Sequence, residues 1–153
     1  MSNAYVAAEV AKIIDKDKNS SEQLALACSW VLAHYKGVNI RAFDVKETSS
    51  LCDYNLVASA ENTTQARAMI EEMIVGLKAK DIEAISLEGM GDAEWILLDL
   101  GSVIVHVFQE ISRDVFDIDS LWMSSPQLTI PSEYYFGSSD AQATKKSSTE
   151  NYF

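Results

Sequence analysis

The feature that most constrains the fold is a pair of apolar runs, Trp95–Leu100 and Val103–Phe108, separated only by Gly101 and Ser102. So short a connection predicts an antiparallel hairpin, because glycine readily adopts the positive φ that tight hairpin turns need. The first run carries apolar side chains on both of its alternating faces. Therefore either helices cover both sides of the predicted sheet, or one face is left for a partner.

Two capping patterns predict where the longer helices begin. Ser20 with Gln23, and Asn62 with Gln65, pair a side-chain acceptor with a glutamine that can return the hydrogen bond. Gly37 is well placed to end the first of these helices in a left-handed conformation. Apolar spacing and turn residues indicate the other elements. The expected helices are 4–15, Ser20 to Gly37, Asn62 to Leu77 and Arg113 to Leu121, and the expected strands are Ile40–Val45, Leu51–Ala58, Ile82–Leu87, Trp95–Leu100 and Val103–Phe108.

This order of elements predicts a single domain of the α/β (α+β) class, with helices packed on a mixed five-stranded sheet. A chain of 153 residues has room for one domain with its own core. We expect residues 1–20 to form an N-terminal extension, 21–122 the domain, and 123–153 a largely disordered tail. Small polar residues dominate the end of the chain, so disorder is expected from about residue 137 onward.

The charge balance bears on the kind of partner. The formal net charge is −11, and the chain has only 12 lysines and arginines. Each neutralised phosphate needs one basic side chain, so we expect no direct sequence-specific binding to nucleic acid. A basic protein partner fits better, because opposite net charges speed the encounter.

The apolar runs are far shorter than the ~20 residues that a membrane span needs. The first residues lack the pattern of a secretion signal, so we expect a cytoplasmic protein that does not bind membranes. Cys28 and Cys52 are too far apart to suggest a zinc site, and we expect both to be reduced and buried.

His106 lies inside the second apolar run and is the first candidate for catalysis. With Asp99 nearby it could act as a general base. A base needs a nucleophile or a scissile group within reach, but the only other histidine is His34, and no Ser or Cys has the nucleophile-elbow pattern. We therefore favour a structural or interface role for His106.

Asp44, Asp53 and Asp99 fall on or beside strand ends, where paired carboxylates could hold Mg²⁺. This leaves a Mg-dependent nucleotidyl-transfer enzyme as the alternative function. Such an enzyme needs paired acids on one strand and a phosphate-binding loop, and Gly89 and Gly91 lack the residues that complete that loop. Capping of turns is the favoured role of these aspartates. We expect no catalytic residue, no cofactor and no metal.

Trp95 and Trp122 suggest recognition instead. A tryptophan at the start of a strand can instead fill space in the core, and the sequence alone slightly favours this role. A partly exposed tryptophan is also a preferred anchor of protein interfaces. Both interpretations stay open at this point.

The stretch from Glu94 to Gln109 resembles the signature of the ribosomal silencing factor (Iojap) family, and the match is long and specific. Shorter matching pieces extend it over residues 21–122 in the family's order and spacing. They are Lys36-Gly37 with Ile40 to Asp44, Ser49-Ser50 with Asp53-Tyr54, Thr64-Gln65-Ala66-Arg67, Glu88-Gly89, and Arg113, Phe116, Asp117 and Leu121-Trp122. The chain departs from the family at Ser102, where an acidic residue is common, and at Phe116, where tyrosine is frequent.

The resemblance implies a nucleotidyltransferase-like outline without the catalytic carboxylates, and hence a protein that is not an enzyme. It implies binding to the large ribosomal subunit through ribosomal protein uL14, which sterically blocks association with the small subunit and represses translation under nutrient limitation. It also implies that the isolated protein can form a homodimer.

Carried over from the family, the contact surface comprises Trp95, Ile96, Leu97 and Leu98, with Asp99, His106 and Arg113 as polar or supporting members. Alternation along the strand alone does not say which of these residues face the partner and which face the core.

Overall fold

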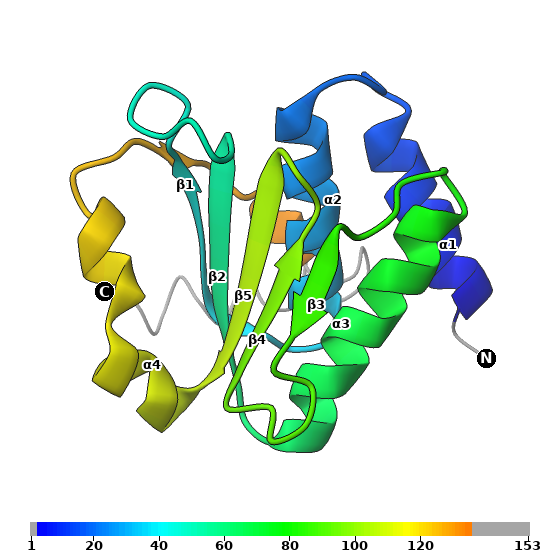
Figure 1. Ribbon diagram of the computed structural model, residues 1–153. Helices are drawn as coiled ribbons and strands as arrows, with labels where there is room; N and C mark the ends of the chain where they lie inside the picture. Colours follow the sequence, from blue (N-terminus) through cyan, green and yellow to red (C-terminus); the bar gives the residue numbers. More distant parts are fainter. Residues whose placement is uncertain (1–2, 136–153) are drawn as a thin grey trace, which may run out of the picture.

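A six-stranded mixed sheet organises the protein. The computed structural model describes residues 3–135, which form a sheet of order β3-β4-β5-β2-β1-β6 with helices on both faces (Figure 1). β2 and β5 are parallel, and all other neighbouring strands are antiparallel. The elements are α1 (Asn3–Ile14), α2 (Ser21–His34), β1 (Val38–Asp44), β2 (Tyr54–Ala60), α3 (Thr63–Lys78), β3 (Ser86–Glu88), β4 (Trp95–Asp99), β5 (Val103–Gln109), α4 (Glu110–Phe116), the 3-10 helix η1 (Ile118–Trp122), β6 (Gln127–Leu128) and the 3-10 helix η2 (Ser132–Tyr134).

The predicted mixed α/β domain is confirmed, with one strand more than expected. The additional strand is β6, which pairs antiparallel with Ala42 and Phe43 of β1. Its two residues carry too little pattern to predict a strand, and their pairing depends on the open edge of β1. The disorder expected from residue 137 onward lies outside the described residues.

Helices α1, α2 and α3 cover one face of the sheet and bury the main core (Figure 1). The predicted helix 4–15 is confirmed, and it packs on both α2 and α3. None of the helices within residues 3–135 is long and apolar enough to cross a bilayer. Cys28 and Cys52 are free and buried, as expected, and burial raises the pKa of the Cys28 thiol to about 12.

Both predicted N-caps are present. Ser20 Oγ accepts from the Gln23 amide at 3.2 Å, and Asn62 Oδ1 accepts from the Gln65 amide at 2.8 Å. In return, Gln65 Oε1 accepts from the amide of Glu61, the residue before the N-cap, at 2.6 Å. Within the described residues, Gln23 Oε1 has no hydrogen-bond partner, so the first capping box is only half formed.

The predicted left-handed end of α2 is one residue off. Lys36 has the positive φ of 68°, and the Gly37 amide bonds to the Leu32 carbonyl at 2.8 Å. This is a Schellman end with lysine at the left-handed position. Glycine is needed at 37 for another reason: a Cβ there would lie 2.8 Å from the Leu32 carbonyl oxygen.

The end of α3 explains why β3 is shorter than the predicted 82–87. Asp81 takes the left-handed conformation at φ 61°, and the Ile82 amide bonds to the Leu77 carbonyl at 3.0 Å. Ile82 therefore completes a second Schellman end instead of joining the sheet. Pairing with β4 begins only at Ser86.

The remaining boundaries shift for similar local reasons. β2 begins at Tyr54 instead of Leu51, because Leu51 is exposed in the preceding turn. The predicted helix Arg113 to Leu121 is two helices, since Asp117 has φ 48° and breaks α4 from η1. This α4–η1 segment covers part of the second sheet face, where Phe43, Val57 and their neighbours form a smaller core.

Candidate docking surface

The hairpin predicted from Gly101 is present and divides the β4 side chains between two environments. Gly101 has φ 92°, and β4 pairs with β5 from Trp95 opposite Phe108 to Asp99 opposite Ile104. Ile96 and Leu98 point into the main core and are 0% exposed. They cannot touch a partner while the domain is folded, so the contact surface inferred from the family loses these two residues. Trp95, Leu97 and Asp99 lie on the opposite face and are partly exposed.

Aromatic rings from α4 and β5 surround Trp95. Its indole stacks on Phe108 with centroids 5.0 Å apart, and the Phe116 ring lies 5.0 Å away on the other element. Phe116 is 51% exposed, and α4 also exposes Ile111 and Val115, which are one helical turn apart. We define the candidate docking surface, called the docking surface below, as Trp95, Leu97, Ile111, Val115 and Phe116. It lies where α4 leaves the second face of the sheet uncovered.

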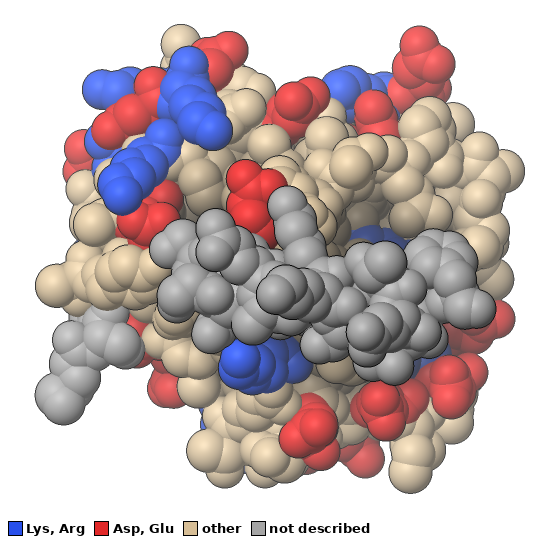
Figure 2. Space-filling model, turned by 180° about the vertical axis from the view of Figure 1, so that it is seen from behind, with Lys and Arg blue, Asp and Glu red and all other residues tan. Residues whose placement is uncertain are grey.

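Acidic residues border this surface. Glu94 precedes Trp95, Glu88 pairs with Leu97 across the β3–β4 ladder, and Asp114 lies on α4; all three are exposed. Elsewhere, on the face seen in Figure 2, acidic side chains are spread widely, and basic ones lie among them at the upper left and at several other places. The apolar centre with an acidic border fits a basic protein surface.

A buried hydrogen-bond chain holds Trp95 from below. The indole Nε1–H donates to His106 Nδ1 at 3.2 Å, and His106 Nε2 lies 3.1 Å from Asn55 Oδ1. Since Nδ1 must accept, the ring proton belongs on Nε2 and is donated to Asn55. Burial lowers the pKa of His106 to about 4, against an opposing effect of the Asp119 carboxylate. His106 is therefore neutral at pH 7, with both nitrogens occupied, and supports the surface from the interior.

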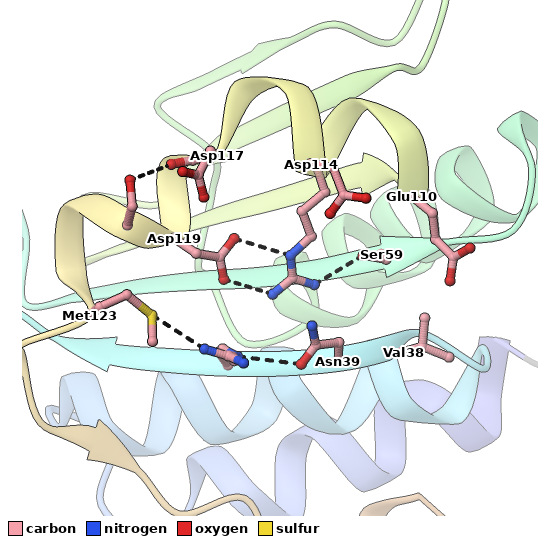
Figure 3. A pocket seen from close by; sticks show the side chains of 11 residues that line it. Val38, Asn39, Ser59, Glu110, Asp114, Asp117, Asp119 and Met123 are labelled. Carbon is pink, nitrogen blue, oxygen red and sulfur yellow. Dashed lines mark hydrogen bonds and ion pairs between the residues drawn. The ribbon is translucent and has the colours of Figure 1, made fainter.

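Arg113, expected to be a polar or supporting member of the contact surface, is buried and bonded within the domain. Its Nε and Nη2 donate to the two carboxylate oxygens of Asp119 at 3.1 and 2.8 Å, and its Nη1 donates to Ser59 Oγ at 3.0 Å (Figure 3). The side chain is 6% exposed. It forms part of the wall of an open polar hollow of about 610 Å³ between α4 and the start of β1. Arg113 uses its Nε, Nη1 and Nη2 groups in these bonds, and it therefore joins α4 to η1 and β2.

Two of the three candidate metal ligands are engaged in turns. Asp44 Oδ1 accepts from the Lys46 amide at 3.1 Å, and Asp99 Oδ1 accepts from the Gly101 amide at 2.8 Å. The turn-capping role expected of these two residues is confirmed. Across residues 3–135, no group of three or more His, Cys, Asp or Glu side chains is placed to hold a metal ion.

Several residues of this site escaped the sequence analysis. Asn55 reaches His106 only because β2 and β5 pair in parallel, and the sequence contains no signal for that pairing. Ser59 and Asp119 were missed for the same reason, since their roles depend on tertiary contacts. Ile111 and Val115 could have been found, because an exposed apolar pair spaced by one turn stands out on an acidic helix.

Fold and site together define a single mixed α/β domain that presents an apolar, acid-bordered surface. The ribosomal silencing factor family model, described as "Ribosomal silencing factor during starvation", matches residues 18–152. The chain belongs to this family.

Individual relatives agree with this assignment. The ribosomal silencing factor RsfS of Haemophilus influenzae is 34% identical over 87 residues, which are 57% of this chain and 85% of the relative. A crystal structure of a protein from Bacillus halodurans superposes with a TM-score of 0.62 at 31% identity, covering 72% of this chain and all of the other. The mouse protein named mitochondrial assembly of ribosomal large subunit protein 1 is 26% identical, covering 46% of this chain and 32% of its own length.

Proposed function

We propose that this protein binds the large ribosomal subunit through ribosomal protein uL14 and sterically blocks association with the small subunit. Translation would be repressed in this way under nutrient limitation, in the cytoplasm. The mechanism is occlusion: the bound domain occupies volume that the small subunit needs. No covalent bond is made or broken in this mechanism, so the protein is proposed to be a regulator and not an enzyme.

One observation carries the proposal: Trp95 is partly exposed, yet a hydrogen bond and contacts with two phenylalanine rings hold it. A held aromatic side chain at the centre of an apolar surface is the typical anchor of a protein interface, because little conformational freedom is lost on binding. The acidic border supplies attraction to a basic ribosomal protein. The family description, with its reference to silencing, and the large-subunit name of the mouse relative support the ribosome as the partner.

Co-sedimentation with purified large subunits tests the proposal. We expect Trp95→Ala to lower the affinity by ~2 kcal/mol or more, since a truncated anchor leaves an empty pocket in the interface. Tyr5→Ala is the matched control, because Tyr5 is an exposed aromatic residue on α1, in the helix layer across the sheet. Equal losses in both variants, or none in Trp95→Ala, would argue against the docking surface.

Subunit joining gives a second readout. Preincubation of large subunits with the protein should reduce the fraction that joins small subunits in a density gradient, and Trp95→Ala should restore it. If the protein binds but joining is unaffected, the occlusion mechanism is wrong even though the partner is right.

A homodimer built on the same surface is part of the proposal. If Trp95 and Phe116 serve both contacts, dimer and ribosome complex compete, and added large subunits should dissolve the dimer. Sedimentation of the free protein at several concentrations, with and without large subunits, measures this competition. The nucleotidyl-transfer alternative has no support from the aspartates, two of which cap turns.

A further inference from the structure

We infer that Asn55 and His106 are positioning residues that hold the Trp95 indole in its docking orientation, and that the uncharged amide at position 55 is required for this. The inference rests on the proposed function, in which Trp95 is the anchor. It adds two buried residues that never touch the partner.

The first step of the argument is geometric. His106 and Asn55 are 5% and 6% exposed and lie diagonally across the β5–β2 pair, on the sheet face that also carries Trp95. Stacking on Phe108 and the tilted contact with Phe116 restrict the indole plane but leave the ring free to flip by half a turn about its Cβ–Cγ bond. The hydrogen bond from Nε1 to His106 Nδ1 removes that remaining freedom.

The second step concerns the proton. An indole N–H can only donate, so the ring nitrogen opposite must carry a lone pair. His106 meets this requirement only while neutral, with its proton on the nitrogen that faces Asn55. An imidazolium would present a second N–H to the indole, and the hydrogen bond would be lost.

The third step explains the amide. The groups facing His106 are Asn55 from β2, Trp95 from β4, and Trp122 and Asp119 from η1. Within residues 3–135, Asp119 is the one carboxylate among these groups, and it is already paired with Arg113. A carboxylate at position 55 would accept the same bond but would stabilise the imidazolium. Asparagine therefore supplies the acceptor without drawing a second proton onto His106.

A pair of variants separates the two hydrogen bonds of His106, one with Trp95 and one with Asn55. In His106→Asn the side-chain oxygen can occupy the place of Nδ1 and still accept from Trp95. In His106→Gln the amide reaches the place of Nε2, keeps the contact with Asn55, and leaves the indole without an acceptor. The two replacements are similar in polarity, so a general loss of stability affects both.

The readout is the Trp95 indole N–H resonance in the free, full-length protein, followed by affinity for purified large subunits. We expect His106→Asn to keep the hydrogen-bonded resonance and bind within about threefold of the unchanged chain. We expect His106→Gln to shift that resonance upfield and bind about tenfold more weakly. Equal resonances or equal affinities in the two variants overturn the inference.

Asn55→Asp tests the role of the uncharged amide. Between about pH 6 and pH 8 the indole resonance of the unchanged chain should stay constant, whereas in Asn55→Asp it should move as His106 gains a proton. A pH-independent resonance in Asn55→Asp overturns this part. If the protein without substitutions does not bind large subunits at all, the proposed function fails. The resonances of the free protein still decide whether His106 and Asn55 position Trp95.

Discussion

Arg113 and Asp119 join α4 to η1 across Asp117, the left-handed residue that separates the two helices. The pair is bidentate and largely buried, with side chains 6% and 15% exposed. It therefore fixes the direction of α4 over the sheet, and with it the position of Phe116 beside Trp95.

Replacing Arg113 by methionine should destabilise the protein by about 3 kcal/mol or more, because Asp119 would remain as a buried carboxylate without its partner. Urea denaturation followed by far-UV circular dichroism measures the change. Lys12→Met is the control, since Lys12 forms an exposed pair with Glu9 and its loss should matter little. If the two variants unfold at the same urea concentration, the Arg113–Asp119 pair does not contribute to stability.

The adjacent residues Leu97 and Leu98 allow a matched test of the two faces of β4. Leu98 is fully buried in the main core, so Leu98→Ala should cost about 2–5 kcal/mol of stability. Leu97 is partly exposed on the docking surface, so Leu97→Ala should cost less stability but weaken binding to large subunits. The same substitution at neighbouring positions thus separates stability from recognition. A Leu97→Ala protein that binds normally would remove Leu97 from the docking surface.

Stability should fall as the pH is lowered below neutrality, and His106 should account for much of the change. Burial lowers the His106 pKa from 6.5 to about 4, so between these values the unfolded chain binds the proton and the folded chain does not. The contribution of His106 to the free energy of unfolding therefore rises with pH across this window. It is fully present above about pH 6.5 and is lost as the pH falls toward 4. The shift corresponds to about 3 kcal/mol.

Urea titrations at pH 7 and pH 4.5 measure this dependence. His106→Asn should flatten it, because asparagine does not titrate. Part of the slope should survive in that variant, since burial also lowers the pKa of His34. An unchanged slope in His106→Asn would show that His106 is not the group responsible.

Local signals were enough to predict the hairpin at Gly101 and the starts of α2 and α3, because turn and cap chemistry depends on residues close in sequence. Signals of this kind also misled. Gly37 suggested a left-handed residue, yet Lys36 takes that conformation. Glycine is needed at position 37 because a Cβ there would lie too close to the Leu32 carbonyl oxygen.

The arrangement of the site needed the tertiary structure. The surface of β4 could not be divided between core and solvent until the helices were placed on one side of it, which buried Ile96 and left Trp95 partly exposed. The parallel pairing of β2 with β5, which brings Asn55 to His106, joins strands separated by α3, β3 and β4. No local pattern encodes such a contact.

The N-terminal helix, expected from the sequence to be an extension outside the domain, should prove to be part of the core. It lies before the residues that match the family model, yet Ile14 is 4% exposed in the main core, and Lys80 on the α3 side pairs with Asp15 at 2.7 Å. Ile14→Ala should therefore cost about 2–5 kcal/mol, as expected for a truncated core side chain. Val75→Ala, at an exposed position on α3, is the control and should change stability by less than about 1 kcal/mol. Thermal unfolding of both variants measures the difference. If Ile14→Ala unfolds at the temperature of the control, α1 is a dispensable addition, and the domain begins at α2.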